Sequence, residues 1–115
     1  MKSILTSIKK LLGITDEYDH FDADLIIHIN SVFMILNQLG VGPSKGFAIK
    51  NKDQTWDEFL LEEDPRFESV KTYIFMKVKL LFDPPMSSAV MESMNRMISE
   101  LEWRLNVASE TSQSD

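Results

Sequence analysis

The sequence predicts an all-α protein, a small bundle of two long and about three shorter helices. One Gly/Pro-rich loop or weak β-hairpin is expected between the second and third helices. Apolar residues recur at spacings of three and four through most of the chain, as in amphipathic helices. Gly13, Gly40 and the pair Pro84-Pro85 stand where these patterns stop. With 115 residues, 43% of them hydrophobic, the chain has the size and composition of one globular domain.

The first helix is predicted over residues 3–12, and Gly13 ends it. Its apolar side is formed by Ile4, Leu5, Ile8, Leu11 and Leu12.

The second helix is predicted from the N-cap Asp22 to Leu39, with Gly40 as its stop. Phe21 before the cap and Ile26 after it occupy the positions of a hydrophobic staple. Apolar residues follow one another along the helix at alternating spacings, and a second line widens this stripe. We therefore expect a central helix that is buried on more than one side. The two lines are Leu25, Ile29, Val32, Leu36 and Leu39, and Ile26 and Phe33.

Residues 40–54 are the least regular part of the chain, and three glycines and Pro43 exclude a helix there. The alternation in residues 47–49 predicts either a protruding loop or a weak β-hairpin. Thr55 and Glu58 then form the pattern of a capping box. This pattern predicts a short third helix whose apolar side is Trp56, Phe59 and Leu60.

The fourth helix is predicted to begin with Asp64 as N-cap and Pro65 at its first position, and to end at residues 83–85. Its predicted core stripe is Phe67, Val70, Ile74, Val78 and Leu81.

The fifth helix is predicted over residues 88–107, antiparallel to the fourth, with Val90, Met94, Met97, Leu101 and Leu105 facing inward. The helical domain thus covers residues 1–108, and residues 109–115 are predicted to be a disordered polar tail.

Charge and composition bear on the class of partner. A net charge of −6 and a pI near 4.8 argue against nucleic acid or an anionic membrane as the main ligand. The most apolar stretch, residues 25–39, is too short to span a bilayer and contains His28, Asn30 and Asn37. The absence of cysteine and of a secretion signal fits a soluble protein that is intracellular at synthesis.

No motif for catalysis or cofactor binding is present, so we expect neither an enzyme nor a cofactor. The densest polar cluster lies before and within the start of the second helix, but it lacks the glycine of a calcium loop. Acidic residues that favour a helix N-terminus explain it more simply, and Asp24 with His28 forms a helix-surface pair. We expect no metal site. The acidic members of the cluster are Asp16, Glu17, Asp19, Asp22 and Asp24, and the histidines nearby are His20 and His28.

Five residues are candidates for contact with a partner protein. Met86 and Met91 lie near the start of the fifth helix, where methionine serves equally well as core filler or as an adaptable contact. Phe47, Ile49 and Trp56 lie in or beside the glycine-rich loop. Such a loop either folds back onto its own domain or inserts into a neighbour, and the composition favours neither outcome. If it inserts, these three side chains would anchor an intersubunit contact.

The chain resembles the head–tail connector (adaptor) proteins of tailed bacteriophages over about residues 4–107. The likeness lies in the order and spacing of the helices and loop and in three segments. These are Lys71-Thr72-Tyr73-Ile74, Lys79-Leu80-Leu81-Phe82-Asp83-Pro84-Pro85 and Glu100-Leu101-Glu102-Trp103-Arg104-Leu105-Asn106. None of them is a catalytic signature.

This resemblance implies a structural subunit of the virion that assembles beneath the portal protein into a ring of about a dozen copies. The ring would extend the DNA channel at the head–tail junction and offer a docking surface for the tail or a stopper protein. Genomic DNA would pass through without sequence-specific binding, and assembly would take place in the host cytoplasm. The alternative is a small helical regulator, such as a DNA-recognition module of the helix-turn-helix kind. No predicted helix carries the basic face that such a module places in the major groove.

Overall fold

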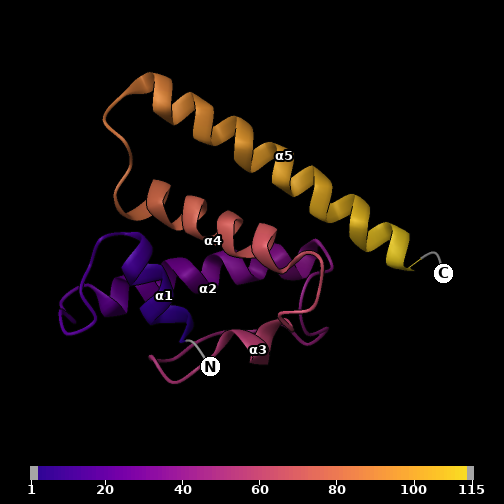
Figure 1. Ribbon diagram of the computed structural model, residues 1–115, viewed down its shortest axis with the longest axis horizontal. Helices are drawn as coiled ribbons and strands as arrows, with labels where there is room; N and C mark the ends of the chain where they lie inside the picture. The colour runs from indigo at the N-terminus through magenta and orange to yellow at the C-terminus, as the bar shows by residue number, and fades with distance from the viewer. Residues whose placement is uncertain (1–2, 114–115) are drawn as a thin grey trace.

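The computed structural model describes residues 3–113, with side chains through residue 108, and this part of the chain contains five helices and no strand. It confirms the predicted all-α class. The helices are α1 (Ile4–Leu11), α2 (Asp22–Gln38), α3 (Trp56–Phe59), α4 (Phe67–Phe82) and α5 (Ser88–Gln113) (Figure 1).

The helices form a slab whose principal extents are 45 × 36 × 20 Å. Helix α4 lies between α2 and α5, and α5 returns over it in the opposite direction (Figure 1). Helix α1 packs on α2 as well. The loop after α2 and the short α3 lie on the side of α2 away from α5 (Figure 1). Helix α2 is therefore the central helix, as its two apolar lines predict.

The predicted glycine stops are confirmed. Helix α1 begins with Ser3 as N-cap, whose hydroxyl accepts a hydrogen bond from the Thr6 N–H at 3.2 Å. Gly13 and Gly40 follow α1 and α2 with φ of +81°, a conformation that glycine adopts without steric cost. The chain turns back at both places, and the N–H of the residue after each glycine donates to a carbonyl of the preceding helix.

Two of the predicted N-caps are wrong, and a third lacks the predicted side-chain hydrogen bond. Asp22 is the first helical residue rather than the cap, and its carboxylate pairs with Lys9. Thr55 is the N-cap residue of α3, as predicted, but its side chain makes no cap hydrogen bond and its hydroxyl donates to Asp57. Asp64 stands before a turn, and α4 begins only at Phe67. The Asp64 carboxylate accepts hydrogen bonds from the backbone and guanidinium of Arg66, which hold the pKa of that carboxyl below its ordinary value. In each case a nearby donor or acceptor competes with the helix end for the side chain.

The core agrees with the predicted stripes except at their edges. Leu11, Leu81, Val90 and Met97 were predicted to face inward but are about half exposed. Helix α5 has α4 as its main neighbour, so only a narrow line on it is covered, and this line includes Ile98. The buried apolar residues are Ile4, Leu5, Ile8, Leu25, Ile29, Val32, Phe33, Leu36, Val41, Ile49, Trp56, Phe59, Phe67, Val70, Tyr73, Ile74, Met76, Val78, Ile98 and Leu105.

Helix α5 is longer than predicted. It continues past the expected end at Val107 to Gln113, through most of the segment predicted as a disordered tail. Ser114 and Asp115 lie outside the described residues. The division into a domain over residues 1–108 and a separate tail stays a prediction.

The loop between α2 and α3 does not protrude, and it is not a hairpin. The Asn30 side chain, on α2, accepts a hydrogen bond from the Ile49 N–H at 2.8 Å and donates one to the Ile49 carbonyl at 3.0 Å. An amide thus pairs with the loop backbone as a neighbouring strand would. The end of the loop is held by an isolated bridge between Ser3 and Thr55. These contacts hold the loop against α2, with Phe47 packed on the ring of Phe33.

Gly42 allows the loop to approach α3 closely. Its φ is +88°, and a Cβ added there would overlap the ring of Phe59. Gly46 has nearly the same backbone, with φ of +89°, but a Cβ there would meet no atom within 4 Å. Alanine substitutions at the two positions therefore distinguish the cost of the left-handed backbone, which both share, from the cost of overlap with Phe59, which arises only at Gly42.

We expect Asn30→Ala to lower the free energy of unfolding by about 2–3 kcal/mol, because it leaves two backbone groups of Ile49 without their partner. Asn37→Ala, at an exposed site on the same helix, is the control and should change stability by less than about 0.5 kcal/mol. Urea denaturation followed by circular dichroism measures both. Equal effects of the two substitutions would mean that the clamp adds nothing to stability.

We expect Gly42→Ala to destabilise the fold more than Gly46→Ala does. Both force alanine into a left-handed backbone at a cost of about 1–2 kcal/mol. Only Gly42→Ala adds the overlap with Phe59, which costs a further ~1–3 kcal/mol. Thermal melts of the two variants give the comparison, and a smaller loss at Gly42 would show that the Phe59 ring can move aside.

Candidate interaction surface

The predicted loop anchors lie inside the subunit. Ile49 and Trp56 are buried, and Phe47 is half-buried against the rings of Phe33 and Phe59, with centroid distances of 5.1 and 5.4 Å. The Trp56 indole N–H donates to the Ser7 hydroxyl at 3.1 Å, which ties α3 to α1. Of the two outcomes open for the loop, folding back onto its own domain describes the single chain. An intersubunit role for these three residues stays a prediction.

The two methionines are on another part of the molecule. Met86 is fully exposed in the turn between α4 and α5, and Met91 is half-buried on the first turns of α5. This turn and the loop carrying Phe47 lie on opposite sides of the fold (Figure 1). The five predicted contact residues therefore do not form one patch.

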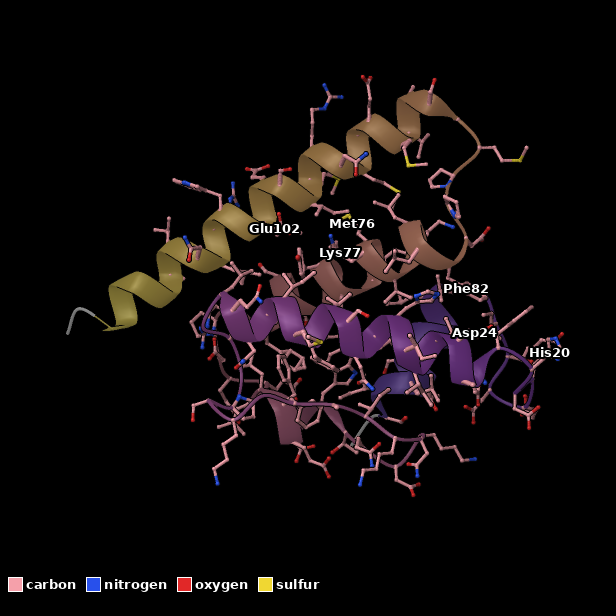
Figure 2. The ribbon with its side chains drawn as sticks, turned by 180° about the vertical axis from the view of Figure 1, so that it is seen from behind. His20, Asp24, Met76, Lys77, Phe82 and Glu102 are labelled. Carbon is pink, nitrogen blue, oxygen red and sulfur yellow. The ribbon has the colours of Figure 1, made fainter. Side chains whose placement is uncertain are left out.

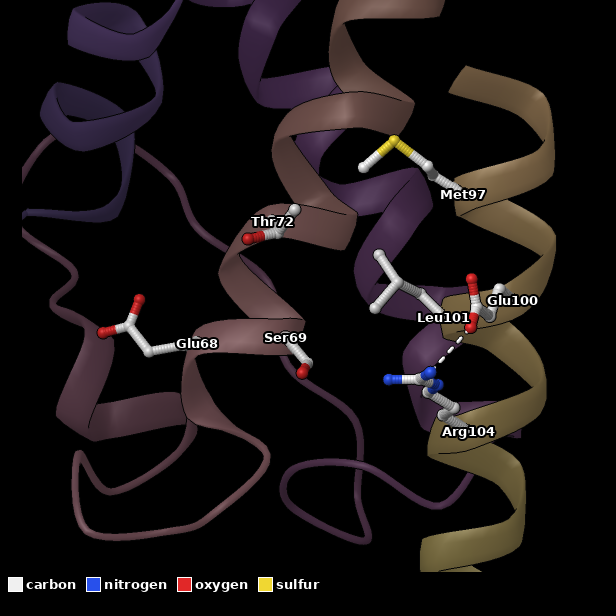
Figure 3. A pocket seen from close by; sticks show the side chains of 7 residues that line it. All are labelled: Glu68, Ser69, Thr72, Met97, Glu100, Leu101 and Arg104. Carbon is white, nitrogen blue, oxygen red and sulfur yellow. Dashed lines mark hydrogen bonds and ion pairs between the residues drawn. The ribbon is translucent and has the colours of Figure 1, made fainter. Parts of the chain in front are cut away.

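A shallow groove of about 290 Å³ runs between α4 and α5 (Figure 3). Apolar atoms of Met97 and Leu101 line it together with polar side chains of α4, and the ion pair of Glu100 with Arg104 at 2.6 Å lies on the α5 side. Such a mixture of apolar and charged groups is typical of protein–protein contacts. The α4 residues that line the groove are Glu68, Ser69 and Thr72.

One hydrogen bond joins the two helices near this groove. The Tyr73 hydroxyl, on α4, donates to the Glu102 carboxylate at 2.6 Å. Glu102 lies on α5 (Figure 2). Burial raises the pKa of Tyr73 well above its ordinary value, and the neighbouring Glu102 adds to this. Because the bond needs the proton on Tyr73, α5 is positioned by a neutral phenol.

The acidic cluster before α2 is organised around a buried lysine. The Lys9 ammonium, on α1, lies 2.9 Å from an Asp22 carboxylate oxygen and donates to the Asp16 carbonyl at 3.0 Å. The Thr6 hydroxyl donates to the Asp16 carboxylate at 2.9 Å. Two of the acids thus fix the connector between α1 and α2. Within residues 3–108, whose side chains the structure describes, no group of three or more His, Asp or Glu is arranged to hold a metal ion.

Sequence reasoning missed Lys9, Asn30 and the Tyr73–Glu102 pair. Asn30 carried the clearest signal, because an amide within a helix buried on several sides must find partners for its N–H and C=O groups. Lys9 shares the side of α1 that packs on α2, so its ammonium also needs a partner. The link between Tyr73 and Glu102 joins residues 29 apart in sequence, and no local pattern predicts it.

Helix α2 and helix α1 leave further apolar side chains exposed. Ile27 and Met34 on α2 are 63% and 68% exposed, and Leu11 on α1 is 52% exposed. Trp103 on α5 is 65% exposed. Across the part of the chain that is described, no helix is both long and apolar enough to cross a membrane.

The chain matches a known protein family. A family model described as "Phage connector protein" matches residues 4–112, nearly the whole chain, which agrees with the resemblance seen in the sequence. Neither the comparison with curated proteins nor that with solved structures finds a match.

We expect Tyr73→Phe to lower stability at pH 7 by about 1–2 kcal/mol, because it removes a hydrogen bond to a charged acceptor. The native chain should also lose stability as the pH rises above about 10, where the unfolded tyrosine ionises and the folded Tyr73 keeps its proton. Tyr73→Phe should reduce this alkaline loss. Urea titrations at pH 7 and pH 10.5 measure both effects. Tyr18→Phe is the control, since Tyr18 is the other tyrosine of the chain and is half-exposed. An equal alkaline loss in the native chain and in Tyr73→Phe would contradict this account.

Proposed function

Because this chain belongs to the phage connector protein family, we propose that it assembles into a ring of about a dozen copies beneath the portal protein. The ring extends the DNA channel at the head–tail junction of the virion and provides the docking surface for a tail or stopper protein. A structural connector role, in association with other head and tail proteins, follows from the family itself. The match over residues 4–112 is the observation that carries the proposal.

The charge of the chain suits a DNA conduit. With a net charge of −6, the subunit repels phosphate groups on average, so DNA can pass without being gripped. Binding to other proteins then depends on local apolar patches. We propose no catalytic activity and no cofactor for this chain. Assembly takes place in the host cytoplasm before the ring joins the virion.

The turn between α4 and α5 is the part of the fold best suited to contact the portal or the tail-side protein. Met86 is fully exposed there, and its flexible thioether adapts to different partner surfaces. Leu81 and Val90, on the helix ends that flank the turn, are about half exposed, so this tip of the fold carries accessible apolar side chains. Met91 is half-buried and follows the tip in α5.

We expect Met86→Asp to weaken binding to the portal or the tail-side protein at least tenfold while the melting temperature stays unchanged, since the native side chain touches little of its own subunit. Leu61→Asp, at another exposed apolar site (62%), serves as the matched control and should bind normally. Pull-down and biolayer interferometry with the purified portal and stopper proteins of the same phage give the affinities. If the native chain binds neither protein, the proposed function is wrong. If Met86→Asp binds as well as the native chain, the contact surface lies elsewhere.

A further inference from the structure

A closed ring of identical subunits needs two different, complementary patches on each copy. The slab is 20 Å thick and has two broad faces, seen in Figures 1 and 2. Each of these faces carries a patch that the subunit itself leaves uncovered. The inference below rests on the proposed self-assembly and concerns which surfaces make the contact.

The first patch is the outer stripe of α2, which we define as Asp24, Ile27, Ser31 and Met34. These residues follow one another at spacings of three and four, so they share one side of the helix. All four are exposed, Ile27 to 63% and Met34 to 68%. In Figure 2, α2 is the helix nearest to the viewer, and no other segment crosses it. The stripe is acidic at one end, and beyond it carries the apolar Ile27 and Met34 with Ser31 between them.

The second patch is the α1–α4 pocket, a hollow of about 410 Å³ between these two helices. Helix α1 lies behind α2 in Figure 2, so the pocket belongs to the other side of the slab. Leu11 supplies an apolar surface that is 52% exposed. Lys10 and Lys71 supply positive charge, and neither has an ion pair among the described residues. The remaining lining residues are the hydroxyl-bearing Ser3, Thr6 and Ser7.

Two aromatic rings position the Lys71 ammonium of the pocket. The Lys71 ammonium lies 5.8 Å from the centre of the Trp56 ring and 5.3 Å from that of Phe67. Contacts of this kind attract a cation to the face of an aromatic ring and limit its movement. In a chain with a net charge of −6, two unpaired lysines at one hollow form a local positive site that fits an acidic partner.

We infer that the outer stripe of α2 in one subunit docks into the α1–α4 pocket of the next copy. Asp24 then faces Lys10 and Lys71, and Ile27 and Met34 cover Leu11. The contact is head-to-tail, because the two patches lie on opposite faces of the slab (Figure 2) and cannot both meet the same neighbour face. Contact of either patch with its own duplicate would place Asp24 against Asp24, or lysine against lysine, and is disfavoured. Each added copy presents a fresh α2 stripe, so the same contact repeats around a ring.

The size of the faces fits a stable interface. Such an interface buries about 800 Å² on each partner. A face that measures 45 × 36 Å offers more than this, and stacking across the 20 Å dimension places it against the next subunit. The apolar side chains at the centre and the charges at one side follow the usual arrangement of protein interfaces.

Cysteine cross-linking tests the contact directly, because the native chain contains no cysteine. In the double variant Leu11→Cys with Ile27→Cys, a short bismaleimide should join neighbours into a ladder of dimers, trimers and larger species on a denaturing gel. Each single variant should give no ladder. The control pairs Ile27→Cys with Leu61→Cys, which is equally exposed (62%) but lines a different hollow. We expect no ladder from this control.

The outcomes separate the inference from the proposed function. Products that stop at dimers, or equal ladders from the test and control pairs, overturn the head-to-tail contact. Sedimentation velocity of the native chain over a range of concentrations gives the reference. A native oligomer with no cross-linking of the test pair overturns the inference alone, whereas a native chain that is monomeric at every concentration overturns self-assembly itself.

Charge reversal provides a second, independent readout. Lys10→Glu with Lys71→Glu should weaken self-association at least tenfold, and adding Asp24→Lys to this variant should restore most of it. Circular dichroism melts check that the variants are folded, and Lys10→Glu alone avoids any loss of the contacts between Lys71 and the aromatic rings. Association that is unchanged in both lysine variants contradicts the proposed role of the pocket.

Discussion

The fold depends on the need to cover α2. This helix has apolar side chains around much of its circumference, so α1, α4 and the loop after it each bury one of its sides. The hydrogen bonds of Asn30 serve the same end, since the loop can pack on α2 only if its backbone groups find partners. Once these three sides are covered, the outer stripe stays open along the middle of α2, between the exposed residues at its two ends. The position of that stripe is therefore a consequence of how the core is built.

Helix α5 stands in a different relation to the rest of the molecule. It packs mainly on α4 along one narrow line that includes Ile98 and Leu105, and Tyr73 anchors it through Glu102. Much of its remaining surface through residue 108 is exposed, including Trp103. A helix held by so small a contact contributes less to the core than α2 does, and it presents more surface to other proteins. The subunit thus combines a firmly packed centre with an outer helix suited to binding.

Helix number, order and most helix ends could be predicted from the sequence because they depend on local signals. Gly13, Gly40 and the prolines after α4 are such signals, and they act whatever the rest of the chain does. The N-caps were less predictable, because the carboxylates of Asp22 and Asp64 can either cap a helix or form an ion pair. Which of these occurs depends on where Lys9 and Arg66 lie. The same holds for the candidate contacts. Phe47, Ile49 and Trp56 look free in a glycine-rich loop until the pairing with Asn30, 19 residues away from Ile49, is known.

The Asn30 clamp recognises only backbone atoms, the N–H and C=O of Ile49. This amide therefore holds the loop through groups that every residue type except proline offers in full. The packing of Phe47 and the close approach at Gly42 complete the fixing of the path of the loop. A substitution at an exposed position of the loop, such as Lys45 or Lys52, can therefore change the surface that the loop presents and leave the clamp intact. The loop is thus a place where the surface chemistry of this fold can change without a change of the backbone path.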